Sequence, residues 1–362
     1  MSKIAKGLLA LRTVIAVVVA MLVSAGLIAA SGKNPYLAFV ALFEGAFLDY
    51  WGIADTLIRM CPMILAALAF LIPFRAGLFN IGAEGQIYAG ALLGTVAALY
   101  LEGLPVWLHI PICFFAGFVG GAMWAFIPAW LNAYYKVNEL IVSLMLNYVS
   151  INIVGFCLQG PLAVPDAPYP YSEQVDAKLE LAPILPQTDV HWGVLVAISA
   201  AVLIYVLLQY SVLGFSYRTI GRSREAALYA GINVKRQIIT SFVLAGGLAG
   251  IAGVIEVLGV KFRLFHAFAS GVGFEGIIVA FLAQGHALMV VVAGFFFAGL
   301  QSGAGMMQRA VGVDAYVIEA IQGIIILFVT ISLSIRFRDS FLARILNSRR
   351  QRLAAGNSEG GA

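Results

Sequence analysis

Long apolar segments joined by short polar connections occupy most of this 362-residue sequence. A helix needs roughly 20 apolar residues to cross a bilayer, and about ten segments approach that length. They lie at 9–30, 55–74, 83–101, 107–131, 139–160, 191–210, 237–259, 273–284, 286–304 and 315–335. With 62% hydrophobic and 11% charged residues, a soluble domain of this size could not cover its own surface. The sequence therefore predicts an all-α fold, a polytopic membrane helix bundle.

The charges of two long connections predict the orientation of this bundle. The connection 161–190 carries five acidic residues and one lysine, whereas 211–236 carries five basic residues and one glutamate. Basic loops are retained in the cytoplasm. We therefore expect 161–190 and 33–55 to be external loops, 211–236 to be a cytoplasmic loop and both termini to be cytoplasmic. Lys261 and Arg263 fall on the external side by this threading, where we expect them to face an anionic ligand or a partner.

The segment 273–284 is too short to cross a membrane, and it is bracketed by Gly271, Gly273 and Gly285. Such a segment is tolerated at membrane depth where protein or a water-filled cavity satisfies its free backbone groups, so it points to the transport pathway. The six residues from Gly82 (GAEGQI) resemble the six from Gly273 (GFEGII). Because our threading runs the two copies in opposite directions, they predict an inverted internal repeat, a common architecture of transporters.

Polar residues inside the apolar segments are candidates for lining this pathway, because unsatisfied polar groups are costly in hydrocarbon. The candidates are Asn80, Glu84, Gln86, Asn147, Glu275 and Gln322. Arg75 is a predicted ion-pair partner of Glu84 across a glycine-rich break between two segments. The pair has two interpretations, a structural contact that closes a helix hairpin or a part of the pathway.

The cytoplasmic loop contains a predicted short helix, which Ser223 can cap and Gly231 can end. The residues expected to contact a partner there are Gly221, Glu225, Ala226, Ala227 and Gly231. From the residues alone, two interpretations stay open. The helix is either a handle for a partner that moves the membrane domain, or part of a loop that its arginines anchor to lipid headgroups. Elsewhere, small-xxx-small patterns at 117–121, 246–250 and 299–303 are expected to pack helices within the bundle.

Catalytic and metal-binding motifs are missing from the sequence. It contains no G-x-x-x-x-G-K-[ST] loop for ATP phosphates, no G-x-S-x-G and no H-E-x-x-H. Its three cysteines and four histidines are scattered without metal-ligand spacing. We therefore predict no catalytic residue, no metal site and no cofactor. Basic residues at membrane edges also differ from the footprint of a nucleic-acid-binding protein.

Three stretches, at 75–87, 138–148 and 225–235, resemble a known family. They are similar to the permease subunits of bacterial ABC importers in the branched-chain amino acid and simple sugar permease family, especially its nucleoside and sugar branch. The resemblance implies a cytoplasmic ATP-binding-cassette ATPase docked on the run 225–231. It also implies a second, related permease subunit and an external solute-binding lipoprotein that meets the loop 161–190.

The resemblance favours the partner-handle interpretation of the cytoplasmic loop. The expected organisation is a transmembrane permease domain at 1–335 and a basic, partly disordered cytoplasmic tail at 336–362. The expected function is a permease subunit of the bacterial inner membrane that moves a nucleoside or simple sugar, with ATP hydrolysed on a separate chain. The alternative is an ion-coupled secondary transporter that uses Glu84 and Glu275 as relays. A membrane-embedded enzyme ranks third, because the sequence shows no cluster of His, Asp or Glu for it.

Overall fold

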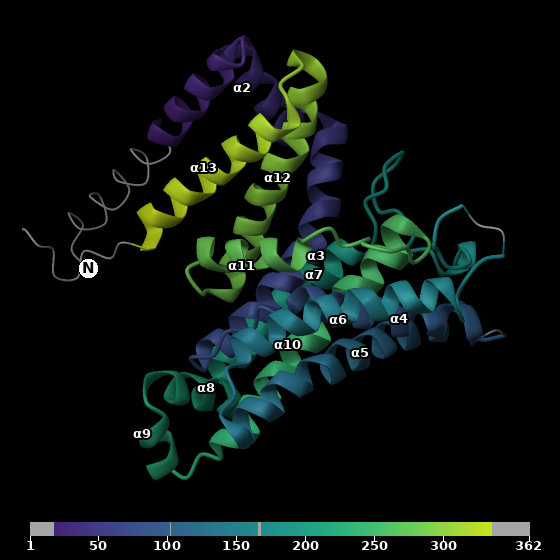
Figure 1. Ribbon diagram of the computed structural model, residues 1–362, viewed down its shortest axis with the longest axis vertical. Coiled ribbons are helices and arrows are strands. Elements are labelled where there is room, and N and C mark those ends of the chain that lie inside the picture. The colour runs from purple at the N-terminus through teal and green to yellow at the C-terminus, as the bar shows by residue number, and fades with distance from the viewer. Residues whose placement is uncertain (1–17, 102, 166–167, 335–362) are drawn as a thin grey trace, which may run out of the picture.

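The computed structural model describes residues 18–101, 103–165 and 168–334. This part of the chain is a bundle of helices (Figure 1), and the only β-pairing within it is two isolated bridges, Tyr171 with Phe265 and Pro183 with His191. The all-α prediction is therefore confirmed. The predicted tail 336–362 and the end of the predicted permease domain at 335 lie outside the described residues.

The helices follow one another with short connections, apart from the long loop between α6 and α7. In chain order they are Val18–Ala30, α2 (Pro35–Phe43), the π-helix η1 (Glu44–Leu48), α3 (Tyr50–Arg75), α4 (Ala83–Tyr100), α5 (Val106–Tyr135), α6 (Glu139–Gln159), the 3₁₀-helix η2 (Ala177–Leu179), α7 (Gly193–Tyr210), α8 (Val212–Arg222), α9 (Arg224–Tyr229), α10 (Val234–Glu256), the π-helix η3 (Val257–Lys261), α11 (Val272–Leu282), α12 (Ala287–Val311) and α13 (Ala315–Ser334).

Six helices in the described part of the chain are long and apolar enough to cross a membrane. They are Tyr50–Arg75, Val106–Tyr135, Glu139–Gln159, Gly193–Tyr210, Val234–Lys261 and Ala287–Val311. The class of polytopic helical membrane protein is thus confirmed, while a total of about ten crossings stays a prediction. The other predicted segments form shorter or less apolar helices.

The stretch 33–55, expected as an external loop, is instead mostly helical. Asn34 caps α2, accepting the backbone N–H groups of Tyr36 and Leu37 at 3.0 and 3.4 Å, and Pro35 occupies the first helical position. An N-cap followed by proline is a common start of a helix. The few charges of this stretch suggested a loop, but the cap at Asn34 and the proline after it start a helix.

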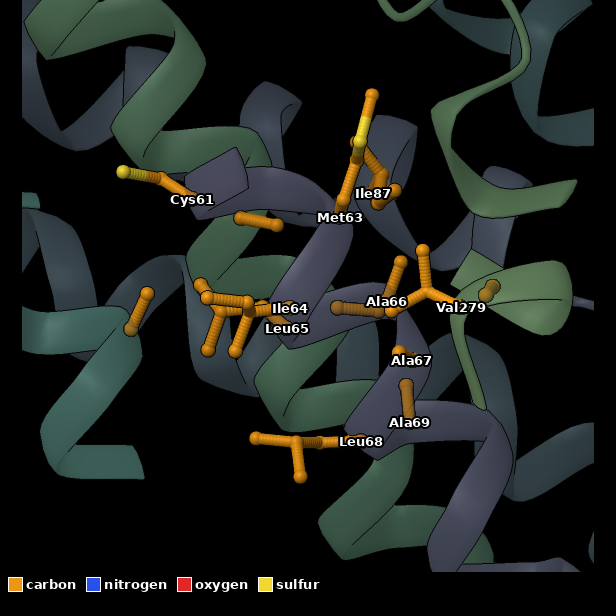
Figure 2. Close-up of a cluster of buried hydrophobic side chains, with 14 of the residues drawn as sticks. Cys61, Met63, Ile64, Leu65, Ala66, Ala67, Leu68, Ala69, Ile87 and Val279 are labelled. Carbon is orange, nitrogen blue, oxygen red and sulfur yellow. The ribbon is translucent and has the colours of Figure 1, made fainter. Parts of the chain in front are cut away.

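Helix α3 forms the centre of the bundle. Every residue from Met60 to Pro73 is buried, and the helix contacts α7, α10, α11 and α12. A helix that is apolar on all sides is stable only when other helices surround it. Figure 2 shows its side chains Ile64, Leu65 and Leu68 in the core, together with Ile87 of α4 and Val279 of α11.

Contacts between the two halves of the chain are reciprocal. Helix α3 contacts α11 and α12, the two α-helices that follow α10. Helix α10 in turn contacts α4 and α5, the two α-helices that follow α3. Glycines allow the α4, α5 and α10 backbones to approach closely. A Cβ atom on Gly90 would overlap Gly250, one on Gly117 would overlap Val254, and one on Gly121 would overlap Gly246. The patterns at 117–121 and 246–250 therefore pack helices within the bundle, as predicted. The reciprocal pairing supports the interpretation of the two halves as inverted repeats.

The acidic loop between α6 and α7 lies against the chain that follows α10. Backbone N–H groups of Ser172, Val175 and Leu181 donate to carbonyls of this chain at 2.8–2.9 Å. Arg263 lies over the ring of Tyr171, 4.9 Å from its centre, and donates to the side chain of Gln174 at 3.3 Å. Arg263, one of the two basic residues that the threading places on the external side, thus lies beside the acidic loop of its own chain.

Candidate functional site

A carboxylate deep in the bundle holds the start of the short helix α11. Glu84, in the first turn of α4, accepts the backbone N–H groups of Gly271 and Gly273 at 2.9 and 2.7 Å. Its side chain is only 3% exposed. A negative charge is favourable at a helix N-terminus, where N–H groups lack partners within the helix. The free backbone N–H groups at the start of this short segment are thus bound by a protein side chain, and Glu84 holds the segment in place.

The predicted ion pair between Arg75 and Glu84 is wrong. Arg75, the last residue of α3, donates instead to the carbonyl of Gly285, just beyond the far end of α11. The two residues sit in the same glycine-rich sequence, but the chain turns between them and α11 separates their side chains. Among the described residues the ion pair within 4.0 Å is Asp55 with Arg59.

Asn80, in the connection before α4, pairs with Gln86 in the first turns of that helix. Each side-chain amide donates to the other's oxygen, at 3.0 and 2.9 Å, and Asn80 also donates to the carbonyl of Ala69 at 3.2 Å. Both side chains are buried. This closed pair satisfies the amide groups internally and fixes the chain between α3 and α4, rather than presenting free hydrogen-bonding groups to a solute.

Asn147 attaches α6 to the start of α4. Its side-chain oxygen accepts the N–H of Gly85 at 2.8 Å, and its amide donates to the carbonyl of Ile81 at 2.9 Å. Ser150, one turn further along α6, donates to the carbonyl of Gly85 at 2.7 Å. A Cβ atom on Gly85 would come within 2.9 Å of Asn147, so the two helices meet at a glycine. Asn147 therefore belongs to the same scaffold as Glu84.

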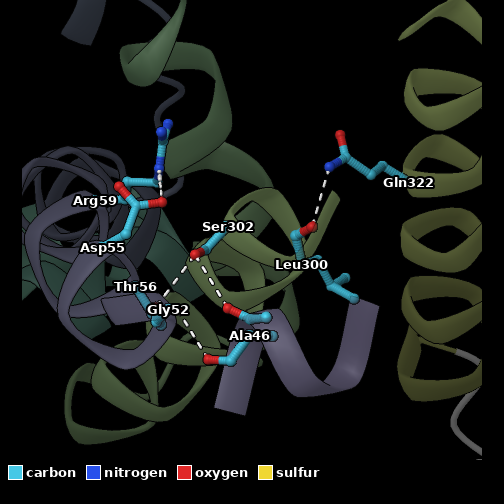
Figure 3. Close-up of polar contacts among 9 residues, drawn as sticks. Ala46, Gly52, Asp55, Thr56, Arg59, Leu300, Ser302 and Gln322 are labelled. Carbon is cyan, nitrogen blue, oxygen red and sulfur yellow. Dashed lines mark hydrogen bonds and ion pairs between the residues drawn. The ribbon is translucent and has the colours of Figure 1, made fainter. Parts of the chain in front are cut away.

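Glu275 and Gln322 are more open than these buried residues. Glu275, on α11, accepts a hydrogen bond from Gln301 of α12 at 2.6 Å, and both side chains are partly exposed. Gln322 of α13 donates to the carbonyl of Leu300 at 3.3 Å (Figure 3). The six predicted pathway residues thus separate into a buried set around the start of α4 and a more open set on α11 to α13.

Charged residues in the N-terminal half of α3 were not among the predicted candidates. Asp55 and Arg59 pair at 2.8 Å, one helical turn apart, with side chains 41% and 48% exposed (Figure 3). The Arg59 guanidinium also lies close enough to act electrostatically on the carboxylates of Glu256 and Glu275. The sequence did carry a signal, because an arginine inside an apolar segment usually faces a polar path or a partner charge.

The loop 211–236, which the charge pattern predicts to be cytoplasmic, folds as two short helices, α8 and α9, that lie together at one end of the bundle (Figure 1). Ser223 accepts the N–H of Ala226 at 3.2 Å and caps α9, and Gly231 follows its last turn with a φ of +75°. The predicted short helix and both of its end signals are confirmed. Ala227 is buried, whereas Glu225 is exposed and Tyr229 is 94% exposed.

Gly221 has a different position from the other predicted contact residues. It lies in the last turn of α8 against the end of α3, where a Cβ atom would overlap the carbonyl oxygen of Arg75. Glu225 and Ala226 are on the open side of α9, while Ala227 packs inward. The described residues contain no group of three or more His, Cys, Asp or Glu side chains that could hold a metal ion.

Comparison with known proteins assigns the chain to a family. The family described as "Branched-chain amino acid transport system / permease component" matches residues 52–330. The chain belongs to this permease family. The match begins in α3 and ends in α13, so it includes the Glu84 site, both predicted repeats and the α8–α9 loop. As a permease, the chain is a transport subunit and a multi-pass membrane protein.

Similar permeases match over nearly the whole chain. The glucose ABC transporter permease of Haloferax volcanii is 37% identical, covering 96% of this chain and 93% of that protein. The guanosine ABC transporter permease of Bacillus subtilis is 34% identical, over 89% of this chain and 93% of that protein. A nucleoside ABC transporter permease of Lactococcus lactis is 31% identical, over 88% of this chain and 89% of that protein.

Proposed function

We propose that this permease is one of two membrane subunits of an ABC importer for a nucleoside or a simple sugar, in a bacterial inner membrane with both termini cytoplasmic. The names of its relatives, which refer to glucose, guanosine and nucleosides, support this solute class. ATP hydrolysis belongs to a separate ATP-binding-cassette subunit, since the sequence contains no phosphate-binding loop of its own.

The exposed helix α9 is the observation that carries the proposal. It is held by its cap at Ser223 and by the buried Ala227, yet it leaves Glu225, Leu228 and Tyr229 open. A rigid short helix with exposed apolar and charged side chains suits a protein partner better than a loop bound only through arginines. We assign this surface to the docking of the ATPase, with the acidic loop 161–190 on the opposite side for a solute-binding lipoprotein.

The second membrane subunit is proposed to be a related sibling rather than a copy. Two different guanosine ABC transporter permeases of Bacillus subtilis match this chain, at 34% and 24% identity. Two nucleoside ABC transporter permeases of Lactococcus lactis also match, at 31% and 23% identity. Pairs of unequal similarity are expected where each transporter uses two diverged permeases.

The candidate pathway residues then divide by role. Arg59, Glu275 and Gln322 are proposed to line the polar path, since they have partly exposed side chains on α3, α11 and α13. Asn80, Glu84, Gln86 and Asn147 are proposed to shape that path by fixing the start of α4 and of α11. Hydrogen-bonding groups around a path suit a polar, neutral solute.

Reconstitution tests the function. The chain would be co-expressed with its ATPase, sibling permease and binding lipoprotein, and uptake of labelled guanosine and glucose by vesicles would be measured with and without ATP. We expect uptake of a nucleoside or sugar that requires ATP and survives an uncoupler. Uptake that persists without ATP and collapses with the uncoupler would instead identify an ion-coupled transporter.

A substitution on α9 tests the docking surface in the same system. Glu225→Lys reverses a charge on an exposed residue, so we expect the fold to persist while the ATPase no longer co-purifies. Lys178→Glu, a matched charge reversal in the loop 161–190, should leave co-purification unchanged. Unaltered ATPase binding and uptake in the Glu225→Lys variant would show that α9 is not the docking site.

A further inference from the structure

The short helix α11 is held at both ends by charged side chains from the other half of the chain. Glu84 accepts the N–H groups of Gly271 and Gly273 at its start. Arg75 donates to the carbonyl of Gly285 at its far end. A carboxylate at the N-terminus and a guanidinium near the C-terminus both complement the dipole of the helix. The position of α11 is therefore sensitive to movement at either contact.

The backbone of Arg75 is also the place where α8 meets α3. Gly221, in the last turn of α8, packs directly on the Arg75 carbonyl, and Gly77, two residues after Arg75, also packs against Gly221. Gly77 has a φ of +74°, a conformation that other residues rarely adopt. Two backbones in direct contact transmit a displacement without a flexible side chain between them, and α9 follows α8 after one residue.

The side chain of Arg75 suits a rigid link. It is half-buried, and its guanidinium lies directly against Gly285, whose carbonyl it binds. A planar guanidinium loses less orientation on binding than a lysine ammonium and presents several donors in a fixed geometry. Removing it would leave the buried Gly285 carbonyl without this donor while leaving the Glu84 contact intact.

From these contacts we propose that Arg75 is a positioning residue that transmits movement of α8 and α9 to α11. A push on α9 moves Gly221 against the Arg75 backbone, and the guanidinium carries that movement to Gly285. Helix α11 then moves as a unit. This movement shifts Glu275 on the candidate path and strains the hydrogen bonds between Glu84 and the start of α11. The inference rests on the proposed function, because a docked ATPase supplies the push.

A reporter on α11 tests this transmission in the full complex. Gln284 is exposed at the end of α11, and Cys61 and Cys113 are buried, so a Gln284→Cys, Cys157→Ser protein offers one accessible thiol among the described residues. Its labelling rate with a membrane-impermeant maleimide would be measured in vesicles, with and without nucleotide trapped by vanadate. We expect trapping to change the rate in this background and to leave it unchanged when Arg75→Gln is added.

Uptake and ATP hydrolysis provide the second readout. With Arg75→Gln we expect the ATPase to co-purify and hydrolyse ATP normally, while solute uptake per ATP falls about tenfold, a typical size for a lost coupling between two sites. Arg75→Lys, which retains the charge without the planar fork, should recover part of the loss. A variant that merely failed to fold would lose co-purification as well.

Arg309 provides a matched control. It is exposed in the last turn of α12, so Arg309→Gln removes the same group from a helix end other than that of α11 and leaves α8 and α9 unaltered. The reporter should still respond to trapping in this variant. An unchanged reporter response and uptake in Arg75→Gln, or an equal loss in Arg309→Gln, would overturn the inference. If the parent complex itself neither binds the ATPase nor responds to nucleotide, the proposed function fails instead.

Discussion

At the scale of single residues, buried polar groups here act mainly as internal connections. Asn80, Gln86 and Asn147 each have a protein partner for their amide groups, and Glu84 has two backbone donors. In an apolar surrounding such groups are costly unless paired, so each pair fixes a particular arrangement of helices. A polar residue inside an apolar segment therefore indicated a structural role. Only the exposure of its side chain distinguished the residues that fix the helices from those that are candidates for the path.

The Glu84 contact gives the first prediction. Glu84→Ala removes the acceptor for the N–H groups of Gly271, which is partly exposed, and Gly273, which is buried, and this should cost about 2–3 kcal/mol of stability. Glu84→Gln retains one acceptor oxygen and should cost less. Thermal unfolding in detergent would measure both. If the alanine variant proved as stable as the parent, the contact would not hold α11 in place.

His191 makes stability depend on pH. It lies two residues before α7 and is buried. Burial lowers the pKa of His191 from the ordinary 6.5 to about 4, although the charge of Asp189 acts in the opposite direction. The unfolded chain gains a proton as pH falls from 6.5 towards 4, and the folded chain does not. The free energy of unfolding therefore decreases as the pH falls from 6.5 towards 4, by about 2 kcal/mol at pH 5.

Unfolding temperatures at pH 7 and pH 5 would measure this loss, with His191→Gln as the comparison. The glutamine variant cannot titrate, so its two temperatures should differ less than those of the parent. An identical pH response in the two proteins would assign the effect to other groups.

At the scale of the elements, glycine determines which helices can touch. Gly250 of α10 lies where α5 crosses, and a Cβ atom there would overlap the carbonyl of Gly117. Gly250→Ala should therefore force the backbones apart and destabilise the protein by about 1–3 kcal/mol. Gly323→Ala, on α13, meets nothing within 4 Å and should be neutral or slightly stabilising.

Unfolding in detergent and yield of folded protein would compare these two variants. Equal behaviour would mean that the α5–α10 contact tolerates separation and that the glycine pattern does not set the packing.

Elements with a local signal were predictable from the sequence, and long-range partners were not. Ser223 and Gly231 identify both ends of α9 because capping depends on neighbouring residues. The helix at 35–48 was missed although Asn34 and Pro35 mark its start. The Arg75–Glu84 pair was wrong because their closeness in sequence gave no information on α11, which lies about 190 residues further along the chain and separates them.

At the scale of the whole molecule, the reciprocal contacts place the second half of the chain against the first. Each half supplies the partners of the other: α3 is enclosed by α11 and α12, and α10 by α4 and α5. The half-helix α11 is consequently attached to the first half at both ends. By the proposed transmission through Arg75, a movement that enters at α8 reaches both halves, as a transporter with two states requires.

A substitution of Arg59 tests the proposed path at the end of the bundle opposite to α9. It pairs with Asp55 and lies near Glu256 and Glu275, so Arg59→Gln removes the one positive charge that these carboxylates share on α3. We expect uptake to fall about tenfold or more with ATPase co-purification unchanged, because the change lies on the proposed path and not on the proposed docking surface. Asp55→Asn, which leaves Arg59 available to the other two carboxylates, should reduce uptake less. Normal uptake by the Arg59→Gln variant would place the solute path away from the N-terminal half of α3.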